Sequence, residues 1–170
     1  MPKKLVTVQE GEILAIPLFL SGEDLLRRFK KSDFQGQGKV FAFGRVIADL
    51  AGGGILIEIF DLAGGLDTPI ARITASARLF RPLAISGLAI HEKRWPSLGH
   101  QEDYDKYRDS DFTNIGLVQG VAENPVLWKG GVKQKIRPEE AQAHEPWIIW
   151  QEDKLEERVL KEMRAKKKMR

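Results

Sequence analysis

Two apolar runs separated by a glycine-rich turn constrain the fold of this chain more than any other feature. In residues 39–47 (KVFAFGRVI), alternate side chains point to opposite sides of an extended chain, and both sides are mainly apolar. Residues 55–62 (ILIEIFDL) form a second, almost unbroken apolar run, and the sequence AGGG lies between the two at residues 51–54. This arrangement predicts a β-hairpin. The core of the protein is therefore expected to be mostly β.

Further strands are expected on both sides of this hairpin. Residues 10–20 predict a strand, and Pro17 inside it favours a position at a sheet edge or a bulge near the strand's end. Residues 83–90 predict another strand, which a loop containing residues 95–100 follows. Two short strands are expected at residues 117–118 and 126–128. Residues 147–150 (WIIW) predict a last, buried strand. Tryptophans usually lie in or beside a core, and Trp128, next to Lys129, is the best candidate for an exposed one.

Helices are expected to be few and mostly short. Ser21 can cap a short inserted helix that carries Leu25, Leu26 and Phe29 on one face. Residues 66–79 favour a short helix, and residues 137–141 (RPEEA) are typical of a helix's first turn. A charged helix is predicted from about residue 152, with an apolar stripe formed by Leu155, Val159, Leu160 and Met163.

The elements together predict an α+β fold. We expect a strongly bent antiparallel sheet, or a small open β-barrel, with the short inserted helix and the C-terminal helix. A chain of 170 residues suffices for one domain with a sizeable core.

Composition excludes several classes of function. The absence of cysteine rules out disulfides, iron–sulfur clusters and thiol nucleophiles. Polar residues interrupt the N-terminal region where a secretory signal would need an apolar stretch, and no apolar run has the length of a membrane helix. We therefore expect a cytoplasmic protein that does not enter membranes.

The net charge of +3 is concentrated at the C-terminus. Residues 161–170 hold six bases and one acid, a local charge of +5, so the first 160 residues carry −2. Such a tail is usually a solvated helix end, but it also allows a small nucleic-acid-binding module as the alternative function. That alternative predicts salt-sensitive binding that disappears when residues 161–170 are removed.

The residues that could carry catalysis or hold a cofactor form no recognisable pattern. His91, His100 and His144 are widely spaced and lack the close pairing of a metal motif. No serine lies in a G-x-S-x-G elbow. The glycines at residues 52–54 lie between two strands, which favours a turn over a phosphate loop. We therefore expect no metal, no cofactor and no catalytic residues.

An acidic segment with aromatic residues is the strongest candidate for a binding surface. Residues 101–112 contain five acids and two bases, a local charge of −3. The segment is either a solvated charged face or a patch that attracts a basic partner and holds it through aromatic anchors. The candidate contact residues are Glu102, Asp103, Tyr104, Asp105, Tyr107, Asp109, Asp111 and Phe112.

Four ordered sequence blocks carry a resemblance to a known family. They are GEILAIPL (residues 11–18), FAFGRV (residues 41–46), a strand ending in FDL (residues 60–62) and RWPSLG (residues 94–99). In this order they resemble the immunity protein 26 family of bacterial polymorphic toxin systems. The resemblance extends over roughly residues 10–150. It implies a structural role for Gly11, Ile16, Pro17, Phe43, Gly44, Arg45, Asp61, Trp95 and Pro96.

The resemblance implies a non-catalytic protein that binds and neutralises a cognate toxin acting in the cytosol. A nuclease is one candidate toxin, because its phosphate-binding cleft would attract the acidic segment. Residues 1–150 would then form one mostly β immunity domain, and residues 151–170 the C-terminal helix and basic tail. The insertion at about residues 19–38 departs from the family pattern and is itself a candidate contact with the toxin.

Overall fold

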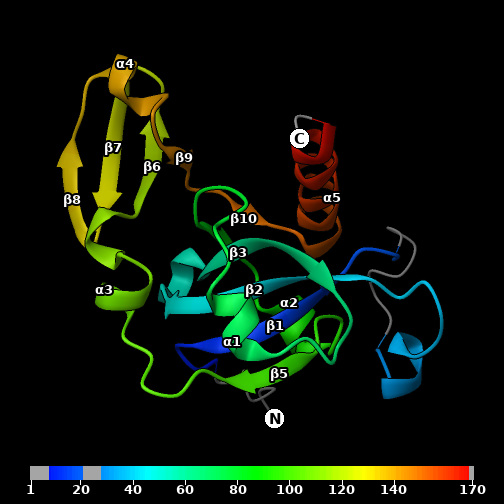
Figure 1. Cartoon of the computed structure of the whole chain (residues 1–170). Coiled ribbons are helices and arrows are strands. Elements are labelled where there is room, and N and C mark those ends of the chain that lie inside the picture. Colours follow the sequence, from blue (N-terminus) through cyan, green and yellow to red (C-terminus); the bar gives the residue numbers. More distant parts are fainter. Residues whose placement is uncertain (1–7, 21–27, 169–170) are drawn as a thin grey trace, which may run out of the picture.

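The computed structural model describes residues 8–20 and 28–168, and they form two β-sheets and a C-terminal helix (Figure 1). The larger sheet has six strands in the order β10-β4-β3-β2-β1-β5. Their bounds are Glu12–Pro17 (β1), Phe41–Asp49 (β2), Ile55–Gly64 (β3), Leu83–Ile85 (β4), Ser97–His100 (β5) and Ile149–Trp150 (β10). The smaller sheet has the order β8-β7-β6-β9. Its strands are Gly116–Val121 (β6), Asn124–Lys129 (β7), Val132–Lys135 (β8) and Glu145–Pro146 (β9).

The predicted hairpin forms the centre of the larger sheet. β2 and β3 pair antiparallel, and the cross-strand partners include Arg45 with Glu58 and Gly44 with Ile59. The glycine-rich turn becomes a short 3-10 helix, Ala51–Gly53 (η3). Two irregularities in the register, after Ala42 and after Val46, bend the pair. The prediction of a hairpin at this place is confirmed.

Both faces of the central strands are buried. Along β1, Leu14 and Ile16 face a cluster that includes Val46, Ile57 and Trp95. Ile13 and Ala15 face a cluster on the other side that includes Phe41, Phe43, Phe60 and Ile73. A third cluster joins the two sheets and contains Ile47, Leu56, Phe112, Leu117 and Trp128. Burial on both faces explains why these strands read as apolar runs.

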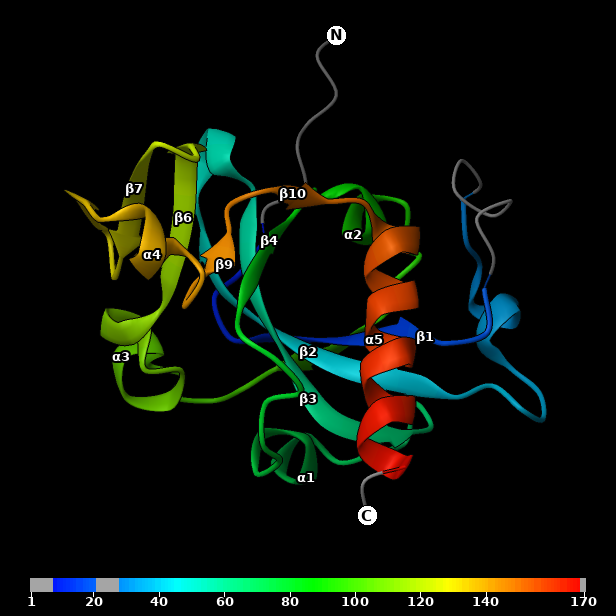
Figure 2. The ribbon, with the colours of Figure 1, turned by 90° about the horizontal axis from the view of Figure 1, so that it is seen from above.

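The longest helix, Glu152–Lys168 (α5), lies across the larger sheet (Figure 2). Leu155 and Val159 are fully buried in the first cluster, and Met163 packs against it. The predicted helix is confirmed, as is its apolar stripe except for Leu160, which is half-buried outside this cluster. The other α-helices are short: Ile70–Thr74 (α1), Leu88–His91 (α2), Lys106–Asp109 (α3) and Pro138–Ala141 (α4). α1 and α4 lie where short helices are expected.

The α+β class is confirmed, but the sheet arrangement differs from the simplest expectation. The strands form two open sheets, not one sheet or a closed barrel. The pairs β10–β4 and β6–β9 are parallel, whereas the other pairs are antiparallel. Parallel pairing is possible because long connections return the chain from β4 to β10 and from β6 to β9.

Local predictions were wrong at four strands. The strand expected at residues 83–90 ends at Ile85, and residues 88–91 form α2 instead. β1 lies inside the sheet, because the loop expected at residues 95–100 contains β5, which pairs with it. Pro17 is tolerated because it is the last residue of β1. The buried strand expected at residues 147–150 is reduced to β10, and Ile148 and Ile149 are about half exposed.

The region of residues 19–38 is only partly described. The inserted helix expected from Ser21 falls mainly on residues 21–27, which lie outside the described residues. After them, Phe29 is buried, and a 3-10 helix, Lys31–Phe34 (η2), places Phe34 in the same cluster.

Candidate functional site

The acidic segment connects the two sheets. It follows β5, contains α3, and continues through the 3-10 helix Phe112–Asn114 (η4) into β6. In Figure 1, α3 lies beside the smaller sheet, close to the start of β6. Glu102, Asp103, Asp105, Tyr107 and Asp111 are exposed, whereas Asp109 is half-buried. The segment therefore presents a negatively charged surface at the junction of the sheets.

A buried arginine holds this segment from beneath. Arg45 is 3% exposed, and its guanidinium donates to the side chain of Gln101 (2.6 Å) and to the backbone oxygen of Asp109 (3.0 Å). It also donates to Ser110 Oγ (3.2 Å) and to Glu58 Oε2 (3.3 Å). One side chain of β2 thus binds the start and the end of the acidic segment. Because these bonds form inside the protein, the segment has little freedom to rearrange.

Glu58 is the buried carboxylate at the centre of this network. Its side chain is about 3% exposed and accepts hydrogen bonds from Arg45, Arg78 and Ser110. Arg78 also donates to the backbone oxygen of Ser110. The two arginines therefore satisfy carbonyl groups at the end of α3, where a helix leaves acceptors without partners. We refer to Arg45, Glu58, Arg78 and Ser110 as the Glu58 network.

Tyr104 packs the segment against the start of β1. An added Cβ on Gly11 would lie 2.7 Å from Tyr104 Cβ, and Gly11 has a φ of +89°. Glycine is therefore required at position 11 for two reasons, the close contact with Tyr104 and the positive φ of the backbone. The Tyr104 hydroxyl lies 2.6 Å from Ser110 Oγ. Because the serine proton goes to Glu58, the tyrosine donates. Burial raises the pKa of Tyr104 to about 12.

Two of the acids maintain the shape of α3. Asp105 caps the helix by accepting hydrogen bonds from the backbone N–H groups of Tyr107 and Arg108. Asp109 forms an ion pair with Arg108 and accepts a hydrogen bond from the N–H of Asp105 (3.0 Å). Glu102, Asp103 and Asp111 remain as the exposed acids whose carboxylates form no ion pair within the described residues.

Replacing Arg108 with glutamine is expected to raise the pKa of Asp109. The Arg108 hydrogen bond, and next the backbone N–H of Asp105, lower this pKa from 3.8 to about 2. A lowered pKa contributes stability above pH 3.8, and that contribution is lost as the pH falls towards 2. Carboxyl ¹³C NMR of Asp109 should show the pKa moving towards 3.8 in the variant. Arg137→Gln, which removes an exposed ion pair elsewhere, should leave it unchanged. An unchanged value in Arg108→Gln would contradict the assignment.

The aromatic residues of the segment have different environments. Tyr107 is 59% exposed, whereas Phe112 is 6% exposed and makes an edge-to-face contact with Trp128. Phe112 is therefore unavailable as an anchor for a partner, because η4 folds its ring into the junction between the sheets. The expectation that Trp128 is exposed was also wrong, because Phe112 and Trp147 cover it.

Comparison with known proteins identifies the family. A family model described as immunity protein 26 matches residues 9–120 of the chain. The chain belongs to the immunity protein 26 family. No curated protein and no solved structure matches it. The family name indicates an immunity protein and a non-enzymatic role. The match includes all four sequence blocks and the acidic segment, and it ends inside β6, so α5 lies beyond it.

The first two blocks of this immunity-family chain lie side by side on β1 and β2. Ile16 and Phe43 are fully buried on opposite faces of the sheet. An added Cβ on Gly44 would lie 3.1 Å from the backbone oxygen of Glu58. Gly44 thus allows a close approach of β3 beside the ion pair of Arg45 and Glu58. Pro17 ends β1 and pairs with Phe41.

The last two blocks connect the sheet to α5. The backbone N–H of Asp61 donates to Ala77, and its carboxylate lies 3.7 Å from Lys166 Nζ. The Pro96 backbone oxygen accepts a hydrogen bond from the N–H of Ala15 (2.8 Å). Trp95 is fully buried and donates through Nε1 to Glu156 (2.9 Å).

Glu156 and Arg94 form a second buried ion pair. Arg94 has no exposed surface, and its Nε and Nη2 donate to the two Glu156 oxygens at 2.9 and 2.6 Å. Burial raises the pKa of Glu156, and the hydrogen bonds from Arg94 and Trp95 oppose this shift. The RWP block thus docks α5 through a charge-assisted contact.

The sequence prediction missed the partners in both networks. Glu58, Arg78, Ser110 and Glu156 were not singled out. A signal existed for Glu58 and Arg45, because each is a charged residue inside an apolar strand, and a hairpin can make such residues cross-strand neighbours.

The histidines and the basic tail are the remaining predicted features. No group of three or more histidine and acidic side chains there is placed to hold a metal. His100 is exposed and forms a hydrogen bond with the backbone oxygen of Glu10. No helix in residues 8–20 and 28–168 is long and apolar enough to cross a membrane. The bases Lys161, Arg164 and Lys167 are exposed on α5, and the alternative of nucleic-acid binding through this tail stays a prediction.

Proposed function

We propose that this chain neutralises a cognate cytosolic toxin by binding it one to one through the acidic segment, without catalysis. The observation that carries the proposal is the attachment of an exposed acidic surface to a buried network. Arg45 fixes the backbone of Asp109 and the side chain of Gln101, so the acids between them are presented in one arrangement. Such preorganisation favours tight binding, because less conformational entropy is lost on association.

The negative charge of this surface favours a toxin with a positively charged binding site. The exposed acids Glu102, Asp103 and Asp111, with Tyr107 next to them, match a partner with a positively charged cleft. A nuclease has such a cleft because its substrate carries phosphates. The acidic segment then acts as a decoy anion that occupies the active site and excludes the nucleic acid.

Capture of the partner tests the proposal directly. Tagged full-length protein would be incubated with nuclease-treated lysate of its source cells and washed at high salt. We expect one retained protein in equal amount, which is toxic when expressed without this chain. Retention of nucleic acid alone, at low salt and without nuclease treatment, would contradict the proposal.

Removing three exposed charges together is expected to slow association with the captured partner. The triple variant Glu102→Gln, Asp103→Asn and Asp111→Asn leaves the Asp105 cap and the Glu58 network intact. Asp103 and Asp111 have φ values of 54° and 50°, a conformation that asparagine tolerates. We expect the association rate to fall roughly tenfold or more at low salt, because electrostatic steering is lost. The difference should shrink as salt is added.

A matched control separates local charge from net charge. The variant Asp67→Asn, Glu123→Gln and Glu139→Gln removes three exposed carboxylates from other elements. Surface plasmon resonance at two salt concentrations should show nearly normal association for this control. Equal slowing in both triple variants would mean that net charge alone is responsible, and the assignment of the acidic segment would be wrong.

A further inference from the structure

A groove lies where the smaller sheet meets η3 and β10 of the larger sheet. Its volume is about 410 Å³. The lining comes from both sheets and from the connections between their strands: Leu50, Gly53, Gln119, Lys133, Trp147 and Ile149. Among these described residues Lys133 is the charged one, so the groove is mainly apolar with a positive charge on one side. We refer to it as the Trp147 groove.

Trp147 forms a fixed aromatic wall of this groove. Its Nε1 donates to the backbone oxygen of Gly53 (2.9 Å), and its ring packs on Trp128 with the ring centroids 5.6 Å apart. An added Cβ on Gly53 would lie 2.5 Å from Trp147 Cζ2, so η3 fits closely against the indole. A side chain that enters the groove therefore meets a preformed surface, which lowers the entropy cost of binding.

The open side of the groove combines exposed apolar surface with unpaired positive charge. Ile149 is 47% exposed. Lys133 is the cross-strand partner of Trp128 and lies on the same face of the smaller sheet, with its Nζ 5.9 Å from the centre of the Trp147 ring. Lys135, two residues further along β8, lies on that face as well. Both lysines are exposed and form no ion pair within residues 8–20 and 28–168.

The fold explains only part of this surface. β8 is an edge strand, and lysine on an edge discourages pairing with strands of other molecules. That role does not require half-exposed isoleucines beside an indole, yet Ile148 and Ile149 are 51% and 47% exposed. A contiguous apolar surface with charged residues at its rim is typical of a protein interaction site. A symmetric second copy is disfavoured, because it would bring the lysines of β8 close to their own equivalents.

We propose that the Trp147 groove receives a segment of the toxin that carries a bulky apolar side chain between two carboxylates. The inference rests on the proposed function, because the segment belongs to the same partner. The apolar side chain would pack on Trp147 and Ile149. The two carboxylates would pair with Lys133 and Lys135.

The groove is close enough to the acidic segment for one partner to contact both. A row of aromatic rings, each centred less than 6 Å from the next, connects them: Tyr107, Phe112, Trp128 and Trp147. Neighbouring surfaces of opposite charge would fix the orientation of the partner, because a reversed partner would meet like charges on both.

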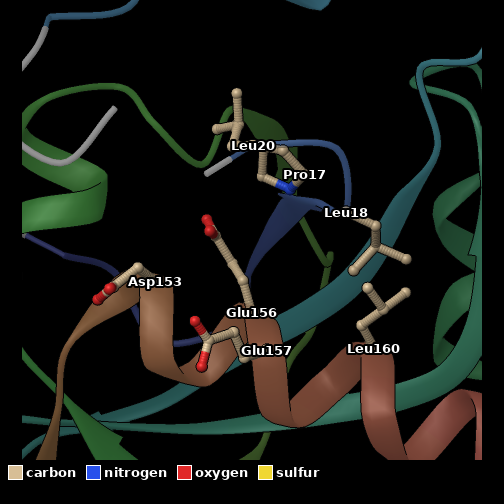
Figure 3. Close-up of a pocket in the computed structure, with 7 residues that line it drawn as sticks. All are labelled: Pro17, Leu18, Leu20, Asp153, Glu156, Glu157 and Leu160. Atoms are coloured by element: carbon tan, nitrogen blue, oxygen red, sulfur yellow. The ribbon is translucent and has the colours of Figure 1, made fainter. Parts of the chain in front are cut away.

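Short peptides test the groove without the toxin. The full chain, labelled at isoleucine and leucine methyl groups and at the indole N–H groups, would be titrated with a blocked tripeptide of leucine between two glutamates and observed by NMR. We expect saturable shifts at Ile149 and Trp147. Replacing the leucine with glycine, or both glutamates with lysines, should remove the shifts. The leucines of the pocket between α5 and the end of β1 are an internal control, because three carboxylates line that pocket (Figure 3) and should repel the acidic peptide.

Two pairs of lysine variants separate the charge of the groove from net charge. Lys133→Gln with Lys135→Gln should weaken peptide binding about fivefold, because two exposed ion pairs are lost. Lys129→Gln with Lys154→Gln removes two exposed lysines, one from the opposite face of the smaller sheet and one from α5, and should preserve binding. Equal shifts with the glycine peptide, or equal weakening in both variants, would overturn the proposal. Shifts of the same signals on dilution of the chain alone would identify a second copy as the occupant and would also overturn it.

Affinity for the captured partner separates this proposal from the proposed function. The double variant Lys133→Gln and Lys135→Gln should raise the Kd about fivefold with an unchanged melting temperature, because both side chains are exposed. Normal partner affinity in this variant, together with slow association in the triple variant of the acidic segment, would overturn the groove proposal and leave the proposed function standing. Weakened affinity here, with normal association in the triple variant, would support the groove and overturn the role of the acidic segment.

Discussion

Replacing Arg45 with methionine is expected to lower the free energy of unfolding by about 3–5 kcal/mol. Methionine has a similar length and fits the apolar surroundings, but it cannot donate to Glu58, Gln101, Asp109 or Ser110. Glu58 would remain buried with Arg78 as its cationic partner. This loss is a large fraction of the total, because the free energy of unfolding of a domain is typically only about 5–15 kcal/mol.

Urea denaturation followed by circular dichroism measures this loss. The matched control is Arg78→Met, which removes the other arginine of the Glu58 network. The Arg78 side chain is one-third exposed, so water can replace part of its interactions, and the loss should be about 1.5–3 kcal/mol, the value of a charged hydrogen bond. If the two variants lose equal stability, the central role of Arg45 would be refuted.

Arg45→Met should also make the acidic segment more mobile. In the native protein, Arg45 and Arg78 bind the backbone oxygens of Asp109 and Ser110, and Arg45 binds the side chain of Gln101. Without Arg45, amide hydrogen exchange should accelerate across residues 101–110 more than in the hairpin of β6 and β7. Uniform acceleration over the whole chain would show that only global stability has changed.

Replacing Arg94 with methionine is expected to have the second large effect, again about 3–5 kcal/mol. Arg94 is fully buried and binds both oxygens of Glu156, which lies 62 residues further along the chain. After the substitution, Trp95 would be the remaining donor to the buried Glu156 carboxylate among the described residues. The consequence should be largest at α5, because Glu156 is on the first half of that helix.

Limited trypsin digestion detects a detached α5. The helix contains many lysines and arginines, so cleavage after Lys154 or Arg158 should become faster in Arg94→Met than in the native protein. Glu157→Gln is a suitable control, because it breaks an exposed ion pair with Lys154 that contributes less than about 1 kcal/mol and leaves both cleavage sites in place. Native cleavage rates in Arg94→Met would mean that apolar contacts of Leu155 and Val159 alone hold the helix.

Buried carboxylates recur where distant parts of the chain meet. Glu58 joins the hairpin to the acidic segment, and Glu156 joins the RWP block to α5. Glu145, at the start of β9, binds Arg158 of α5 and lies 3.9 Å from Arg81. Because an unpaired buried charge is costly, each of these contacts disfavours alternative packing of its two elements.

The local patterns in the sequence determined the hairpin of β2 and β3, the presence of strands at β6 and β7, and α5. These elements follow from apolar periodicity and turn residues, which act over a few neighbouring positions. The sequence blocks also indicated the family. The acidic composition of residues 101–112 predicted an exposed surface, and most of its acids are exposed.

Only the tertiary structure decided which residues meet across long separations. The loop expected at residues 95–100 became β5 because it pairs with β1, and Phe112 became buried because η4 places its ring against Trp128. Arg94 binds Glu156 because α5 docks on the sheet, and Arg45 binds Gln101 and Ser110 because the acidic segment folds over the hairpin. No local pattern records these pairings, because their free energy depends on burial that arises only when the sheets and α5 have assembled.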